Sequence, residues 1–260
     1  MLVLALPLWA GARHTVLMDV LRTEELAVIL HEEGQTFGAT LDRDWLDGTG
    51  GSVWAQQVMR IYDPARLSEG IRRGLEQTLE GETLENVIEF FASDLGGRIL
   101  TLENSARRAL ADEGVEQAAR ERYAELKDTG DARLEQINRM IVAGDLVQRN
   151  VTSALNSNVQ FMRALVDGDL YAMSEEEILN DVLAERDTIE ADTEGWLGAF
   201  LLLAYSPLTL EELTTYADFS ETDAGRALNA GFFAGFNPLY EDISYALGQA
   251  LVRHMGAQEL

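Results

Sequence analysis

The side chains that could do chemistry in this chain are histidines, carboxylates, hydroxyls and arginines, because cysteine is absent. The three histidines are His14, His31 and His254, and no two of them are one or two helical turns apart. Lack of cysteine removes thiol nucleophiles and Cys-ligated zinc or iron–sulfur centres. No serine lies in a G-x-S-x-G elbow or pairs with a histidine by spacing. The sequence therefore gives no support for nucleophilic catalysis, and we predict no cofactor.

One histidine has neighbours suited to a metal ion. His31 follows Glu24 by one heptad and stands beside Glu32 and Glu33, so a Glu/His site is conceivable. Acidic residues are so numerous in this chain, 45 in all, that no pair or cluster of them stands out. We therefore predict no metal site.

Two arginines lie in a phrase that the chain contains twice. Residues 91–100 (FASDLGGRIL) and residues 219–228 (FSETDAGRAL) both read F-x5-G-R-x-L, and they are 128 residues apart. Arg98 and Arg226 could present guanidinium groups to an anionic ligand at neighbouring helix N-termini. The favoured alternative is that each phrase forms a corner between two helices.

The corner interpretation accounts for each shared residue of the phrase. Ser220 to Asp223 supply caps for a new helix, and a glycine in its first turn lets the preceding helix approach closely. The arginine can reach the carbonyl groups that end the preceding helix, where a cation is favoured. The residues assigned to this structural or ligand motif are Phe91, Gly97, Arg98, Phe219, Gly225 and Arg226.

Two further patterns lie on predicted helices. An uncharged polar stripe (Asn150, Ser153, Ser157 and Gln160) predicts a buried hydrogen-bond network or a domain contact, with a ligand-reading surface as the alternative. Near the C-terminus, small residues recur every four positions at Ala227, Gly231 and Gly235. They predict a groove for a closely packed helix, or alternatively a dimer seam.

These residues must be positioned by helices, because helix-forming residues dominate and strand-like alternation is almost absent. We predict an all-α multi-helix bundle with two similar halves joined by long helices. The predicted divisions are a signal-peptide remnant (1–12), an N-terminal half (13–144), a connecting helix (145–173) and a C-terminal domain (174–260).

Charge narrows the predicted partners. The formal net charge is −25, and Lys127 is the chain's lysine. So acidic a protein repels the phosphate backbone of nucleic acids, and we predict no nucleic-acid binding. The apolar run from Trp196 to Tyr205 is about half the length of a bilayer span, so we predict no transmembrane segment.

The N-terminus predicts export. An apolar run over residues 2–9 is followed by Ala10-Gly11-Ala12, an A-x-A pattern, and then by Arg13, as at the end of a secretory signal peptide. A basic segment before the run is missing, and the run is short. The alternative is therefore the first turn of a buried helix.

The second copy of the phrase also carries a resemblance. Leu208 to Leu213, Tyr216, Phe219 and Gly225-Arg226 resemble the domain of unknown function 2059 of exported bacterial proteins, whose pattern is F-[YS]-x-[ST]-x-x-G-[KR]. Thr222-Asp223 replaces the Ser-Pro pair of the family. The first copy of the phrase, near Phe91, matches the family pattern less well. The resemblance covers residues 174–248, and it implies an α-helical periplasmic protein with no assigned catalytic residues.

These observations favour a non-enzymatic, acidic, exported protein that acts by binding a protein partner, a ligand or a second copy of itself. The alternative is a hydrolase-type enzyme with a carboxylate/Arg or carboxylate/His pair in a cleft between the two halves.

Overall fold

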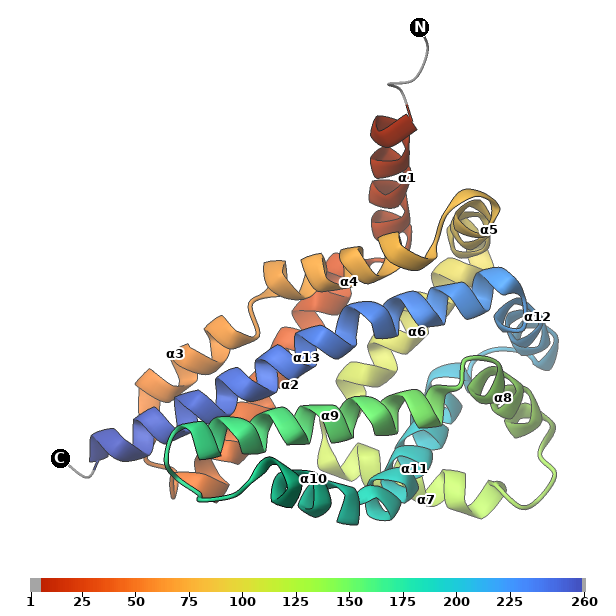
Figure 1. The fold of residues 1–260 in the computed structure, drawn as a ribbon. Coiled ribbons are helices and arrows are strands. Elements are labelled where there is room, and N and C mark those ends of the chain that lie inside the picture. Colours follow the sequence, from red (N-terminus) through yellow and green to blue (C-terminus); the bar gives the residue numbers. More distant parts are fainter. Residues whose placement is uncertain (1–5, 259–260) are drawn as a thin grey trace, which may run out of the picture.

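The computed structural model describes residues 6–258, and all of its regular elements are helices (Figure 1). The predicted all-α fold class is confirmed. In chain order the helices are α1 (Leu6–Val20), α2 (Thr23–Trp45), α3 (Gly51–Ile61), α4 (Pro64–Thr78), α5 (Gly81–Ala92), α6 (Asp94–Ala109), α7 (Glu113–Leu126), α8 (Ala132–Ala143), α9 (Leu146–Asp167), α10 (Glu175–Ala184), α11 (Arg186–Tyr205), α12 (Leu210–Ser220) and α13 (Asp223–Gln258).

Side-chain caps fix where many of these helices begin. The carboxylate of Asp63 accepts a hydrogen bond from the backbone N–H of Arg66 (3.0 Å), and Pro64 occupies the first helical position of α4. Ser174 and Glu177 form a reciprocal capping box at the start of α10. Because the caps satisfy N–H groups that the first turn leaves free, short connections between helices are sufficient.

The long helix α13 runs through the middle of the molecule, with α4 along one side and α9 along another (Figure 1). Glycines allow α4 and α13 to approach closely: a Cβ on Gly74 would lie 2.6 Å from Cα of Gly235, and one on Gly235 would lie 2.5 Å from the carbonyl oxygen of Gly70. The small-residue face that includes Gly231 and Gly235 is therefore occupied by α4 of the same chain.

The predicted polar stripe lies on α9, which packs against α13. Asn150, Ser153, Ser157 and Gln160 are half-buried, and among residues 6–258 no hydrogen bond joins any two of them. Asn150 instead donates to the carbonyl oxygen of Leu146 on its own helix (2.7 Å). The four side chains therefore form no network with one another, and the alternatives of a domain contact and a ligand-reading surface stay predictions.

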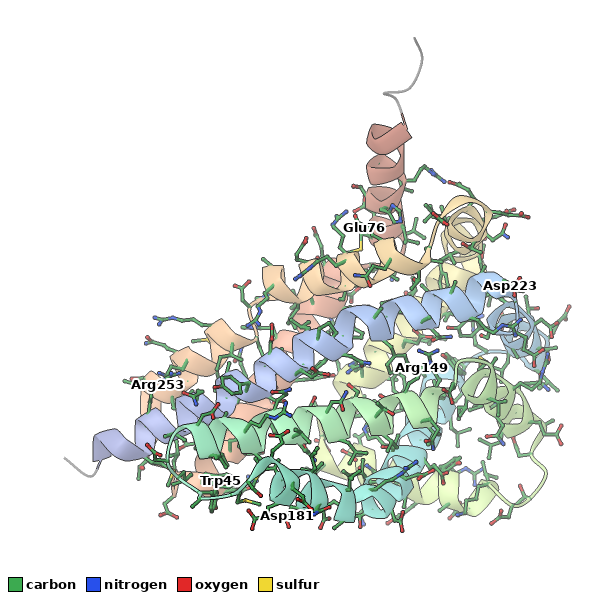
Figure 2. All side chains as sticks on the ribbon, in the orientation of Figure 1. Trp45, Glu76, Arg149, Asp181, Asp223 and Arg253 are labelled. Carbon is green, nitrogen blue, oxygen red and sulfur yellow. The ribbon has the colours of Figure 1, made fainter. Side chains whose placement is uncertain are left out.

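An arginine completes the α9–α13 contact. Arg149, labelled in Figure 2, belongs to α9. Its guanidinium lies 5.6 Å from the ring centroid of Phe233 on α13, so a cation–π interaction links the two helices.

Two hydrophobic clusters form the core, and each draws on residues from both ends of the chain. One cluster includes Leu17, Ile99 and Leu213, and the other includes Trp54 and Leu247. The proposed division of the chain at 145 and 174 stays a prediction.

The N-terminal helix α1 includes residues 6–12 of the predicted leader and continues to Val20, while residues 1–5 of that prediction lie outside the described residues. In Figure 1, α1 stands out from the body, beside α5. Of the helices described, none is long and apolar enough to cross a membrane.

Candidate functional site

The α5–α6 and α12–α13 connections are two copies of one corner. At the first, the Ser93 hydroxyl accepts a hydrogen bond from Gly96 N–H (3.1 Å) and donates to the carbonyl oxygen of Phe90 (2.6 Å). At the second, the Thr222 hydroxyl accepts from Gly225 N–H (3.1 Å) and donates to the carbonyl oxygen of Phe219 (2.6 Å). Both hydroxyls therefore end one helix and begin the next.

The register of the two corners differs by one residue from that of the repeated phrase. Ser93 matches Thr222 and Gly96 matches Gly225, so equivalent residues are 129 positions apart. A Cβ on Gly96 would lie 2.5 Å from Cα of Phe91, whereas the nearest atom to one on Gly97 is 3.8 Å away. The assignment of the close-approach glycine to Gly97 is therefore wrong. The geometry of each corner is set by the capping hydroxyl three residues before the close-approach glycine, and not by the arginine of the phrase.

The two corners meet through their aromatic rings. Phe90 and Phe219, which are equivalent residues, stack with ring centroids 4.0 Å apart and an interplanar angle of 14°. Phe91 is buried and meets Phe219 edge-on at 5.6 Å. These contacts hold the end of α5 beside the end of α12.

The two arginines of the phrase do not converge. Arg98 donates to the Glu212 carboxylate (2.6 Å) and to the carbonyl oxygen of Pro207 (2.7 Å), which ties α6 to the α11–α12 connection. Arg226 is mostly exposed and pairs with Asp223 of its own helix (3.3 Å). The prediction that Arg226 binds the carbonyl groups ending α12 is wrong, and the pair does not form an anion site.

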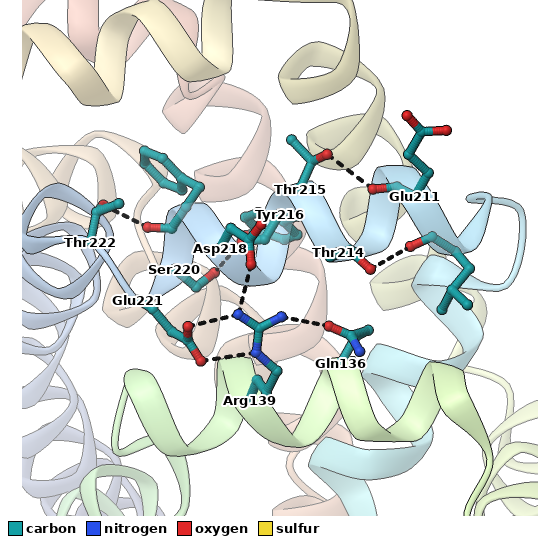
Figure 3. Close-up of polar contacts among 12 residues, drawn as sticks. Gln136, Arg139, Glu211, Thr214, Thr215, Tyr216, Asp218, Ser220, Glu221 and Thr222 are labelled. Carbon is teal, nitrogen blue, oxygen red and sulfur yellow. Dashed lines mark hydrogen bonds and ion pairs between the residues drawn. The ribbon is translucent and has the colours of Figure 1, made fainter.

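A different arginine holds the end of α12. Arg139 of α8 donates to Asp218 (2.7 Å) and, through two nitrogens, to both carboxylate oxygens of Glu221 (Figure 3). Its remaining nitrogen donates to the side-chain oxygen of Gln136 (2.7 Å). The guanidinium is thus fully engaged in joining α8 to α12.

Helices α6, α11, α12 and α13 supply most of the lining of a partly open cavity of about 230 Å³ behind the two corners. Phe91, Phe219 and Gly225 of the corners are part of its wall. Its polar wall consists of α6 residues and two tyrosines, namely Glu103, Asn104, Arg107, Tyr205 and Tyr216.

Glu103 is the centre of this polar wall. Tyr205 donates a hydrogen bond to its Oε1 (2.6 Å), and Tyr216 donates a longer one to the same oxygen (3.2 Å). Burial raises the pKa of the Glu103 carboxyl, while the two tyrosine hydroxyls and Arg107 oppose that shift. Glu103 Oε2 accepts no hydrogen bond from the residues that the structure describes.

Arg107 forms its ion pair with Glu33 and not with Glu103. Its guanidinium forms a two-bond contact with Glu33 of α2, with distances of 2.7 and 3.1 Å. Burial opposes the charge of Arg107, but Glu33 outweighs that effect and the pKa of Arg107 is raised. The Arg107 and Glu33 charges therefore compensate one another.

The rest of the wall is apolar and largely aromatic. Phe232 and Phe236 stack with ring centroids 5.9 Å apart, and Phe200 of α11 lines the same space. Leu146 and Leu228 complete the apolar lining near α9 and α13. The cavity thus combines one polar wall with a broad apolar surface, the arrangement usual in small-molecule sites.

The sequence contains a signal for Glu103 that our prediction of the site missed. Ile99, Leu100 and Ala106 form the buried side of α6, and Glu103 falls on that same side by helical spacing. A carboxylate on an apolar helix face needs a partner. Its partners, Tyr205 and Tyr216, lie about a hundred residues further along the chain, so spacing alone does not reveal them.

A second, more open groove of about 610 Å³ lies between α7 and α11. Val115, Leu126 and Leu203 are among its lining residues, and Val115 is exposed. Nothing in the part of the chain that the structure describes identifies an occupant of this groove.

His31 is engaged in structural contacts. Its Nδ1 is 2.7 Å from the carbonyl oxygen of Tyr62, and its Nε2 is 2.7 Å from the side-chain nitrogen of Gln35. Within residues 6–258, no three His, Asp or Glu side chains are grouped so that they could hold a metal ion.

Residues 65–125 match the model of a bacterial protein family, a segment that spans α4 to α7 and includes the first corner. The family is DUF2059, an uncharacterized protein conserved in bacteria. The resemblance to DUF2059 is confirmed, but its placement at 174–248 is wrong. Phe90, Ser93 and Gly96 repeat the spacing of Phe219, Thr222 and Gly225, so the corner pattern alone does not distinguish the DUF2059 segment from its second copy. Neither a curated protein nor a solved structure matches the chain.

Proposed function

We propose that this protein is exported and binds a small molecule in the cavity behind the two corners. The observation that carries the proposal is a partly open cavity with one hydrogen-bonding wall and one aromatic wall. Apolar surface supplies affinity in such sites, and a few fixed polar groups orient the ligand. The contacts of Phe219 with Phe90 and Phe91 support a preformed site, because Phe91 and Phe219 both belong to the cavity wall.

Cavity filling tests the binding proposal. Leu146→Trp places a large ring at the apolar wall, and we expect it to weaken binding of 2-phenylethanol, a neutral probe with an aromatic body, by about tenfold or more. Leu179→Trp is the matched control, because Leu179 is exposed on α10 and lies outside the cavity. Equilibrium titration by calorimetry measures both. Equal affinity of wild type and Leu146→Trp would contradict the proposal, as would absence of binding by wild type to this alcohol and to its ammonium and carboxylate analogues.

Export rests on the apolar run of residues 2–9 and the A-x-A pattern that follows it. We expect the protein recovered from the periplasm of a producing bacterium to begin at Arg13. N-terminal sequencing of that fraction makes the measurement. Recovery in the cytoplasm with residues 1–12 still attached would contradict export.

The alternative of a hydrolase-type enzyme draws support from the raised pKa of Glu103 and the neighbouring Arg107. Its predicted arginines, Arg98 and Arg226, are not among the residues that line the cavity. Ser220 lines the cavity and would be a candidate nucleophile. Its hydroxyl, however, donates to the Tyr216 carbonyl oxygen of its own helix (2.8 Å). Binding is the better supported of the two, and interaction with a protein partner or a second copy stays a prediction.

A further inference from the structure

The charged groups around the cavity are paired, with one exception. Arg107 is compensated by Glu33 (2.7 Å), and Arg108 on the next position of α6 by Glu25 (2.9 Å). Glu103 has two neutral tyrosine hydroxyls as its hydrogen-bond partners and no cation of its own. Glu103 is half-buried, and the Arg107 charge that favours its carboxylate is shared with Glu33, so a second cation beside Glu103 would stabilise its charged form.

The unused oxygen of Glu103 is available to a ligand. Both tyrosines donate to Oε1, which leaves the acceptor sites of Oε2 unfilled by protein groups. Oε2 is not among the fully enclosed atoms that lack a partner, and Glu103 lines the cavity. A donor within the cavity can therefore reach it.

The aromatic wall favours the same kind of ligand. Phe200, Phe232 and Phe236 line the space into which Glu103 faces, and the faces of aromatic rings attract cations. The net charge of −25 also raises the local concentration of cations around the protein.

We propose that the cavity binds an organic cation, with an ammonium group that donates to Oε2 of Glu103 and a short apolar body that packs against Phe200, Phe232 and Phe236. This inference rests on the proposed function, since it names the class of ligand for the same cavity. The ammonium group takes the role of the missing counter-charge.

Binding of the cation favours the charged form of Glu103. Burial raises the pKa of the Glu103 carboxyl, and an ammonium group paired with the carboxylate would lower that pKa, so a proton held by the carboxyl passes to solvent on binding. The ligand's affinity should therefore rise with pH until the pH exceeds the pKa of free Glu103. The titratable groups facing this carboxyl, directly or through Arg107, are Tyr205 on α11, Tyr216 on α12, Arg107 on α6, Glu33 on α2 and Tyr240 on α13.

Three probes with the same aromatic body test the inference: 2-phenylethylammonium, 2-phenylethanol and phenylacetate. We expect the cation to bind the wild-type protein about tenfold more tightly than the alcohol at pH 8, and phenylacetate to bind least well. Calorimetry over a range of pH, in buffers of different ionisation enthalpy, should show more proton release for the cation than for the alcohol.

Glu103→Gln removes the charge and keeps the size of the side chain. We expect this variant to bind the cation no better than the alcohol, to lose the proton release, and to retain binding of the alcohol, which also shows that it is folded. Glu89→Gln is the charge-matched control, since Glu89 is exposed on α5 and outside the cavity.

The outcomes separate the two claims. If the alcohol binds and the cation binds no more tightly, the cation assignment is overturned and the cavity remains a binding site. If none of the three probes binds, both the cation assignment and the proposed function are overturned. Unchanged cation affinity in Glu103→Gln would also contradict the assignment, because Oε2 would then not be the anchor.

Discussion

Gly74→Leu is expected to destabilise the protein by about 3 kcal/mol or more, because overpacking at this position meets backbone and not flexible side chains. A Cβ at Gly74 would lie 2.6 Å from Cα of Gly235, so α4 and α13 would have to separate along their whole contact. Since most domains are stable by only about 5–15 kcal/mol, separation of the central helix pair should lower the melting temperature sharply. Thermal unfolding followed by circular dichroism measures the change.

Gly256→Leu is the matched control for Gly74→Leu. It makes the same substitution on α13 itself, at an exposed position where a Cβ would have no atom within 4 Å. We expect the control to melt close to wild type. A wild-type melting curve for Gly74→Leu would show that α4 does not occupy the small-residue face of α13.

The second large effect is expected at the corners, where adjacent glycines should behave in opposite ways. Gly96→Ala should cost about 1–3 kcal/mol, because its Cβ would lie 2.5 Å from Cα of Phe91. Gly225→Ala should cost about as much, because its Cβ would lie 2.7 Å from Cα of Ser220. Gly97→Ala should be neutral or stabilise by about 0.5–1 kcal/mol, since alanine favours a helix interior more than glycine does.

Chemical denaturation of the three alanine variants tests this order. Each serves as a control for the others, because all three make the same substitution near a helix start. If Gly97→Ala were the more damaging of the adjacent pair, the register of the repeated phrase would be right and the register of 129 residues would be wrong.

The class of the fold was predictable because it depends on local features. Ser174 to Glu177 and Asp63-Pro64 are capping signals, and the helices begin where they indicate. The small residues at Gly231 and Gly235 also predicted a close helix neighbour, although nothing in the local sequence distinguished α4 from a second chain.

The register of the two corners was harder to predict, because the alignment of residue types differs by one residue from the alignment of the corner geometry. The phrase aligns Gly97 with Gly225 through the following arginine, yet the corner depends on a hydroxyl three residues before the close-approach glycine. Arg98 and Arg226 then make unrelated contacts, with Glu212 and Asp223. The same residue type in both copies of the phrase therefore did not imply the same contact in the structure.

The polar wall of the cavity escaped prediction for a different reason. In so acidic a chain, Glu103 is one carboxylate among many, and its distinguishing property is that it accepts hydrogen bonds from Tyr205 and Tyr216. That property arises from packing of α6 against the consecutive helices α11 and α12, which lie far along the chain from α6. Arg107 and Glu33 illustrate the same point, because their pairing depends on how α2 lies against α6.

The central claim, that the cavity behind the corners is the binding site, is tested most directly by NMR titration of the wild-type protein with 2-phenylethanol. We predict chemical-shift changes concentrated on the ring signals of Phe200, Phe232 and Tyr216, which line the cavity. Changes concentrated on Val115 and Leu203 of the α7–α11 groove, with the cavity signals unmoved, would contradict the claim.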